Sequence, residues 1–298
     1  MVPASSAAVS ATFAALALFG FVAPAKARLV EEQLMVPVRA VTIQGKEVAQ
    51  KIVVTIFYED AAAKPYPVLV INHGRSANAE GRAALGRMRE LTASRWFVSL
   101  GFMVALPTRV GYGVSGGEDV EYSGLCKSKN YPPVYAASAA QTLQVLEALR
   151  SRPDVAGNRT VILGQSFGGM TSITLAALNP PGVQAAINFA GGGGGNPKTL
   201  PQQPCGQPQL KNLFSDYGKT ARVPTLWVYT ENDMYFGPKL PKEWFDAFRA
   251  AGGTGEFRQF PPLGDDGHQF FSRARETWQP QVLQFLRANG YPGLKPSR

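Results

Sequence analysis

Residues 160–169 read Thr-Val-Ile-Leu-Gly-Gln-Ser-Phe-Gly-Gly, an apolar run followed by a serine between glycines. The apolar run predicts a strand that is buried on both faces of a sheet. Residues 171–178 have a helical pattern, so Ser166 lies at a turn from strand to helix. Such a tight turn strains the backbone of the serine, tolerates only small neighbours and exposes the hydroxyl at the sheet edge. Ser166 is therefore the candidate nucleophile.

Further strands and helices alternate along the chain. We expect strands at residues 38–45, 51–58, 68–72, 102–107, 183–189, 225–229 and 255–260, and helices at 82–100, 135–150, 241–251 and 273–289. Continuously apolar strands that are separated by helices imply a mostly parallel sheet with helices on both faces. The fold class is therefore α/β.

Two long connections interrupt this alternation, at residues 108–133 and 191–222. We find no core segment in the second one. Both exceed the usual length of connections without secondary structure, which indicates that they are functional or mobile. Because both follow strands, we expect them at the carboxyl edge of the sheet, where open α/β folds place their sites.

The N-terminus has the pattern of a secretory leader. Residues 11–23 are small and apolar, and Ala25-Lys26-Ala27 fits a signal peptidase site, although residues 1–10 lack Lys and Arg. The apolar run is too short to span a bilayer. We therefore expect a signal peptide at 1–27, a catalytic domain at 28–298 with no membrane span, and export to the periplasm or medium.

Composition excludes several classes of protein. With 298 residues, 45% of them hydrophobic, the chain can bury a sizeable core. The net charge of +9 comes from scattered residues, not from a basic stripe, so we expect no nucleic-acid partner. Two histidines and two cysteines are too few for a zinc ribbon or a multi-histidine centre, and we expect no metal.

A serine hydroxyl needs a neighbouring base, which in turn needs an orienting carboxylate. After a turn of this type the acid and then the histidine follow in the chain. His268 is the single histidine downstream of Ser166, and Asp233 follows the strand at 225–229. The alternatives for the acid are Glu231, Asp265 and Asp266.

The oxyanion formed in acyl transfer requires backbone donors. One comes from the residue after the nucleophile, Phe167, and the other from the loop after an earlier strand, which gives Arg75 or else Ser76. His73 is then a buried turn residue near the site. Five aromatic residues are candidates to line the pocket: Tyr112, Tyr122, Tyr131, Tyr235 and Phe236.

Taken together, His73-Gly74, the loop 109–116, Ser166, Asp233 and His268 resemble the dienelactone hydrolase-like group of the α/β-hydrolase superfamily. The resemblance implies an α/β-hydrolase fold and a serine hydrolase that cleaves small carboxylic esters without a cofactor. Ser166 departs from the pattern of the dienelactone hydrolases proper, whose nucleophile is a cysteine. The alternatives are a peptidase related to the prolyl oligopeptidase catalytic domain and a non-catalytic binding protein on this scaffold.

One cysteine lies in each long connection, Cys126 in the first and Cys205 in the second. An exported protein meets oxidising conditions. We therefore predict a Cys126–Cys205 disulfide that ties the two connections together over the pocket.

Overall fold

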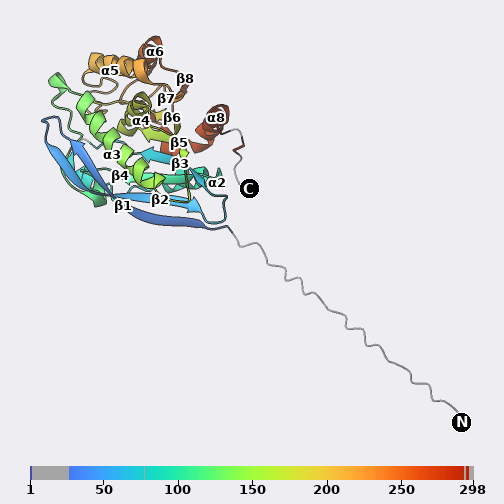
Figure 1. Cartoon of the computed structure of the whole chain (residues 1–298). Helices are drawn as coiled ribbons and strands as arrows, with labels where there is room; N and C mark the ends of the chain where they lie inside the picture. Colours follow the sequence, from blue (N-terminus) through green and yellow to red (C-terminus); the bar gives the residue numbers. More distant parts are fainter. Residues whose placement is uncertain (2–26, 77, 292, 295–298) are drawn as a thin grey trace.

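The fold is a sheet of eight strands between two layers of helices (Figure 1). The computed structural model describes residues 1, 27–76, 78–291 and 293–294. The strands are β1 (Leu29–Val41), β2 (Glu47–Glu59), β3 (Tyr66–Asn72), β4 (Met103–Thr108), β5 (Val155–Gln165), β6 (Val183–Phe189), β7 (Thr225–Thr230) and β8 (Gly255–Phe260). The α-helices are α1 (Ala79–Ala83), α2 (Leu91–Ser99), α3 (Pro132–Arg150), α4 (Phe167–Leu178), α5 (Gln207–Thr220), α6 (Leu240–Ala250), α7 (Phe270–Arg273) and α8 (Arg275–Ala288).

The strand order is β1-β2-β4-β3-β5-β6-β7-β8. The pairs from β4 to β8 are all parallel, whereas β1 and β2 form an antiparallel hairpin and β2 joins β4 antiparallel. This confirms the predicted mostly parallel α/β fold. The first strand begins earlier than expected and ends at Val41, because residues 42–46 form the hairpin turn.

Alternate residues of the central strands point to opposite faces. Leu69 and Ile71 of β3 pack with α2, α7 and α8, while Val68 and Val70 pack on the side of α3. Toward β7, the second face is covered by α4, α5 and α6. Both faces are therefore buried, which explains the continuous apolar runs in the sequence.

The expected helix at 82–100 is wrong, because the chain forms α1 and α2 with an irregular segment between them. Gly86 has a φ of +65° and Glu90 a φ of 33°, and neither conformation fits a right-handed helix. Buried polar contacts hold the segment: the Met88 amide donates to the Thr108 hydroxyl, and the Thr55 hydroxyl donates to the Met88 carbonyl. Long-range bonds thus override the helical pattern.

The connection 191–222 was expected to lack core residues, and this is also wrong. Its second half is α5, which buries Leu210, Leu213 and Phe214. The spacing of these residues is the signature of one helical face, so the signal was present in the sequence. Gly206, the residue before the helix, has a left-handed conformation, and no side chain caps the helix. The sequence therefore has no capping residue that would mark where the helix begins.

The expected leader at 1–27 lies outside the described residues, except for its two end residues. In the described part of the chain, no helix has the length and apolar character needed to cross a membrane.

Phe214 tests whether α5 belongs to the core. Its ring is fully buried, 4.9 Å from the ring of Trp227 and 5.5 Å from that of Trp244. We expect Phe214→Ala to lower the free energy of unfolding by about 3–5 kcal/mol, because it removes buried apolar surface and leaves a cavity. Urea denaturation measures this loss. Lys211→Ala, on the exposed side of the same helix, is the control, and equal effects of the two variants would contradict the assignment.

Candidate active site

Ser166 occupies a strained turn between β5 and α4. Its φ is 57° and its ψ is −123°, an unfavourable conformation for a residue with a side chain. The turn leaves no space beside it: a Cβ on Gly164 would lie 2.0 Å from the Gly168 carbonyl oxygen, and one on Gly168 would lie 2.1 Å from that of Asn72. The two glycines therefore allow the sharp turn that presents the Ser166 hydroxyl.

The structure brings Ser166, His268 and Asp233 into one hydrogen-bonded line. His268 Nε2 lies 2.9 Å from Ser166 Oγ, and His268 Nδ1 lies 2.9 Å from Asp233 Oδ2. A carboxylate accepts only, so Nδ1 carries a proton and Nε2 is free to accept from the serine hydroxyl. Asp233 is fully buried and His268 is 3% exposed.

Backbone donors fix the Asp233 carboxylate. Its Oδ1 accepts from the amides of Tyr235, at 2.8 Å, and Phe236, at 3.1 Å, which leaves Oδ2 for His268. Of the other acids considered, Glu231 and Asp265 are exposed.

Asp266 has a positioning role that the sequence did not reveal. Its Oδ1 accepts from the Met234 amide at 3.0 Å and from the His268 amide at 2.9 Å. One carboxylate oxygen thus joins the loop that holds Asp233 to the loop that holds His268. The proximity of Asp266 to His268 in the sequence was the available signal.

Two of the five candidate aromatic residues contact the histidine. The Tyr235 ring stacks on the His268 ring at 4.0 Å, and the Phe236 ring meets it edge-on at 5.4 Å. Tyr235 also lines the pocket at Ser166, whereas the other four candidates do not.

The loop after β3 lies against Ser166. A Cβ on Gly74 would be 3.3 Å from the Ser166 Cβ, so the loop passes directly beside the serine. The backbone amides of Arg75 and Phe167 donate to no backbone or side-chain group among the described residues. Arg75 and Ser76 both line the pocket that contains Ser166.

A buried ionic network supports this loop. Arg109 and Glu121 form an ion pair with both side chains fully buried, and Arg109 Nη1 donates to the His73 carbonyl at 2.9 Å. The Tyr112 hydroxyl donates to Glu121 at 2.6 Å. Arg75 makes two bonds of 2.7 Å to the carboxylate of Asp119. The loop 109–121 therefore fixes the backbone on which the Arg75 amide lies.

His73 lies in the turn beside Ser166, is 3% exposed and is held at both ring nitrogens. Nδ1 donates to the Gly74 carbonyl at 2.7 Å, and Nε2 accepts from the Arg109 amide at 3.2 Å. Burial, and then the charge of Arg109, place the pKa of His73 well below its usual value. The ring is thus a neutral part of the turn.

The pocket beside Ser166 and His268 has a volume of about 230 Å³. Its apolar lining comes from Ile71, Leu85, Met88 and Phe271, and its polar lining includes Glu90, Gln165 and Gln269. In the part of the chain that the structure describes, no three His, Cys, Asp or Glu side chains gather as metal ligands would.

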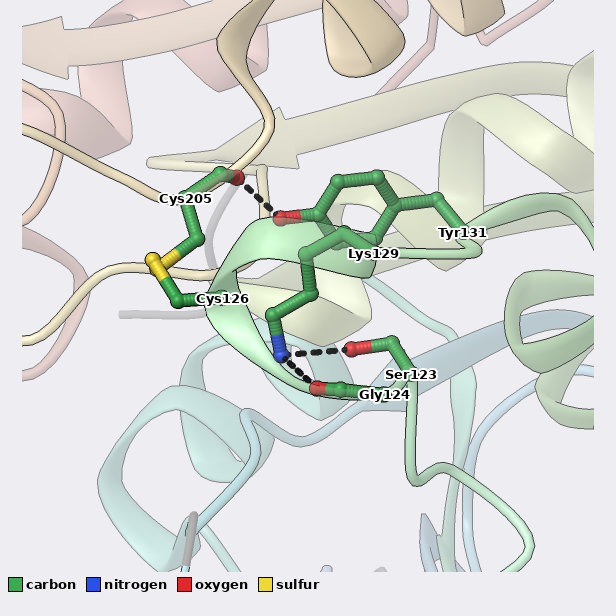
Figure 2. Close-up of a disulfide and its surroundings, with 6 residues drawn as sticks. All are labelled: Ser123, Gly124, Cys126, Lys129, Tyr131 and Cys205. Carbon is green, nitrogen blue, oxygen red and sulfur yellow. Dashed lines mark hydrogen bonds between the residues drawn. A yellow bond between two sulfur atoms is a disulfide. The ribbon is translucent and has the colours of Figure 1, made fainter.

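The predicted pair Cys126 and Cys205 is joined by a disulfide, with Cα atoms 5.0 Å apart (Figure 2). The Tyr131 hydroxyl donates to the Cys205 carbonyl beside it. The Tyr131 ring stacks on the Tyr135 ring, with 6.1 Å between their centroids, and the Tyr135 ring stacks on the Phe167 ring at 4.5 Å. A continuous line of contacts thus connects the disulfide with the residue after Ser166.

Replacing both cysteines with serine tests how much this crosslink stabilises the folded protein. The chain-entropy model assigns a loop of this size a stabilisation of about 4–5 kcal/mol, which native-state strain reduces. We expect the double variant to lose about 2–5 kcal/mol of unfolding free energy in urea. The wild-type protein in a strong thiol reductant should lose a similar amount, and unchanged stability in both cases would contradict the prediction.

The buried neutral His73 makes stability depend on pH. Below a pH of about 6.5 the unfolded chain gains a proton at this residue that the folded chain does not. The contribution of His73 is therefore complete above that pH and falls on acidification, by up to about 1.4 kcal/mol per pH unit. Denaturation at about pH 7.5 and about pH 5.5 should show a smaller pH dependence for His73→Asn than for the wild type. Equal dependence in both proteins would mean that His73 titrates normally.

Comparisons with known proteins show what this chain is similar to. No curated protein matches the chain by sequence. A solved structure from Klebsiella pneumoniae subsp. pneumoniae, described as a candidate dienelactone hydrolase, is 18% identical, with a TM-score of 0.59 over 88% of this chain and 98% of that one. An acetyl xylan esterase from Paenibacillus sp. R4 is also 18% identical, with a TM-score of 0.55 over 88% and 89%.

Dipeptidyl peptidase 4 from Porphyromonas gingivalis shares the fold over 87% of this chain but only 35% of its own length, with a TM-score of 0.59 and 16% identity. The dienelactone hydrolase family matches residues 54–286, which is well over half of the sequence. This range contains Ser166, Asp233 and His268. The chain belongs to the dienelactone hydrolase family of the α/β-hydrolase superfamily.

Proposed function

We propose that the protein hydrolyses carboxylic esters through an acyl-enzyme intermediate on Ser166. The observation that carries the proposal is the line of two 2.9 Å hydrogen bonds from Ser166 through His268 to Asp233. Membership of a hydrolase family supports the reaction class. The function requires no cofactor, because the three side chains supply nucleophile, base and acid.

In the first half of the reaction, Ser166 Oγ attacks the ester carbonyl while its proton passes to His268 Nε2. The Asp233 carboxylate stabilises the imidazolium that forms, and does not itself take the proton. Collapse of the tetrahedral intermediate releases the alcohol, which receives the proton from His268. A water molecule then repeats the sequence on the acyl group and frees the acid.

The charge that develops on the carbonyl oxygen needs fixed donors. We assign this role to the Phe167 amide, at the first turn of α4, and the Arg75 amide. Neither amide has another acceptor in the described residues, and the N-terminus of α4 adds a favourable dipole. Because the buried Arg109–Glu121 pair fixes the loop, these donors need little rearrangement during the reaction.

The pocket favours small to medium esters over a large substrate, since its volume is about 230 Å³. A peptidase is the alternative, because dipeptidyl peptidase 4 shares this fold in about a third of its length. Parallel assays of dipeptide amides and short-chain esters separate the two activities. The disulfide supports export, because such bonds persist in oxidising compartments.

Ser166→Ala and His268→Ala test the mechanism. Each removes a member of a unit that acts together, so we expect kcat for 4-nitrophenyl acetate to fall about 10⁴–10⁶-fold. Ser151→Ala, at the exposed end of α3, is the control and should keep full activity. A fluorophosphonate probe should label the wild type and not Ser166→Ala. Normal ester hydrolysis by Ser166→Ala would refute the assignment.

A further inference from the structure

Glu90 is an acidic residue in an unusual position beside the site. It precedes α2 with a φ of 33° and a ψ of 51°, a left-handed conformation that is costly for a residue other than glycine. Its carbonyl accepts from the Ser94 amide at 2.9 Å, so the strained backbone is held in place. Glu90 lines the same pocket as Ser166 and His268.

The Glu90 carboxylate has no hydrogen bond or ion pair to any residue that the structure describes. Arg87 and Arg89 both bind Glu31, and Arg75 binds Asp119 with two bonds. Arg275, whose charge acts on Glu90, donates its hydrogen bond to the Ser272 carbonyl. Burial raises the pKa of the Glu90 carboxyl, and the charge of Arg275 opposes this shift. A partly buried carboxylate without a hydrogen-bond donor carries a desolvation cost, so the place of Glu90 in the pocket points to a ligand that supplies the donor.

The other residues that line the pocket narrow the class of ligand that it can bind. Ile71, Leu85, Met88 and Phe271 offer apolar surface. The Gln165 amide already donates to the His268 carbonyl at 2.9 Å, and the guanidinium of Arg75 is held by Asp119. A molecule in the pocket therefore meets a carboxylate that no described residue binds by a hydrogen bond, and the opposing charge of Arg275 lies outside the lining of the pocket.

Resting on the proposed ester hydrolysis, we propose that Glu90 is a specificity-determining residue that accepts a hydrogen bond from the substrate. The preferred substrates are esters whose acid or alcohol part carries a hydroxyl or ammonium group, such as esters of polyols. Esters that carry a second, ionised carboxylate are rejected, because two like charges would share one pocket.

Two matched series of esters test this inference, one varying the acid and one varying the alcohol. The first consists of 4-nitrophenyl esters of hexanoic acid, 6-hydroxyhexanoic acid and adipic acid. The second consists of the acetates of 4-methylphenol, 4-(hydroxymethyl)phenol and 4-hydroxybenzoic acid. Within each series the terminal group changes from methyl to hydroxymethyl to carboxylate. Because this group also alters the intrinsic reactivity of the aryl acetates, each ratio of kcat/KM is compared between the variant and the wild type, which isolates recognition of the group.

In at least one series, Glu90→Gln should raise kcat/KM for the carboxylate ester about tenfold relative to the methyl ester, and it should lower the preference for the hydroxyl ester several-fold. Glu147→Gln, an exposed position of α3, is the matched control and should leave all ratios unchanged. The wild-type protein offers a second measurement: its discrimination against the carboxylate ester should shrink as salt is added.

The outcomes separate this inference from the proposed function. If Glu90→Gln hydrolyses the methyl esters normally and all ratios stay at their wild-type values, the role of Glu90 is refuted and ester hydrolysis stands. If Glu90→Gln does not fold, wild-type ratios that are insensitive to salt refute the inference. If the wild type hydrolyses none of the esters, the proposed function fails, and the selection by Glu90 fails with it.

Discussion

The backbone of Ser166, with a φ of 57°, carries a strain that the rest of the molecule must hold. The turn is possible because Gly164 and Gly168 allow β5 and α4 to approach each other and the loop after β3. It is maintained because β5 is hydrogen-bonded to a parallel neighbour on each side, and because the Ser166 amide donates to the Phe189 carbonyl at 2.8 Å. A sheet with both faces buried is therefore what keeps the serine in a conformation that it would otherwise leave.

The same requirement for rigidity explains the ionic network behind the loop after β3. A fully buried pair such as Arg109 and Glu121 gains little net stability, because desolvation offsets most of the attraction, yet removal of one partner is strongly destabilising. Arg109 also donates to the His73 carbonyl, so the pair fixes the backbone two residues before Arg75. The network thus adds little net stability, but it fixes the backbone at the sheet edge where Ser166 lies.

Local sequence was sufficient for the features that depend on neighbours in the chain. The apolar run before Ser166 and the glycines around it predict the turn, and the order of Asp233 and His268 predicts which side chains the fold brings to it. The break between α1 and α2 was beyond this reasoning, since it depends on contacts of Met88 with Thr55 and Thr108, residues distant in sequence. The buried partners of Arg109 were missed for the same reason. The helix α5 is different, because its apolar spacing was visible and only its uncapped start concealed it.

Three carboxylates near Ser166 differ in what surrounds them, and this difference separates their roles. Asp233 accepts from two amides and from His268, and Asp266 accepts from the Met234 and His268 amides, so the fold itself supplies the donors of both. Glu90 lines the same pocket without a donor, on a backbone that is strained but held. A carboxylate whose donors the protein does not supply must take them from water or from a ligand. The carboxylate for which the fold supplies no donor is therefore the one best placed to distinguish one substrate from another.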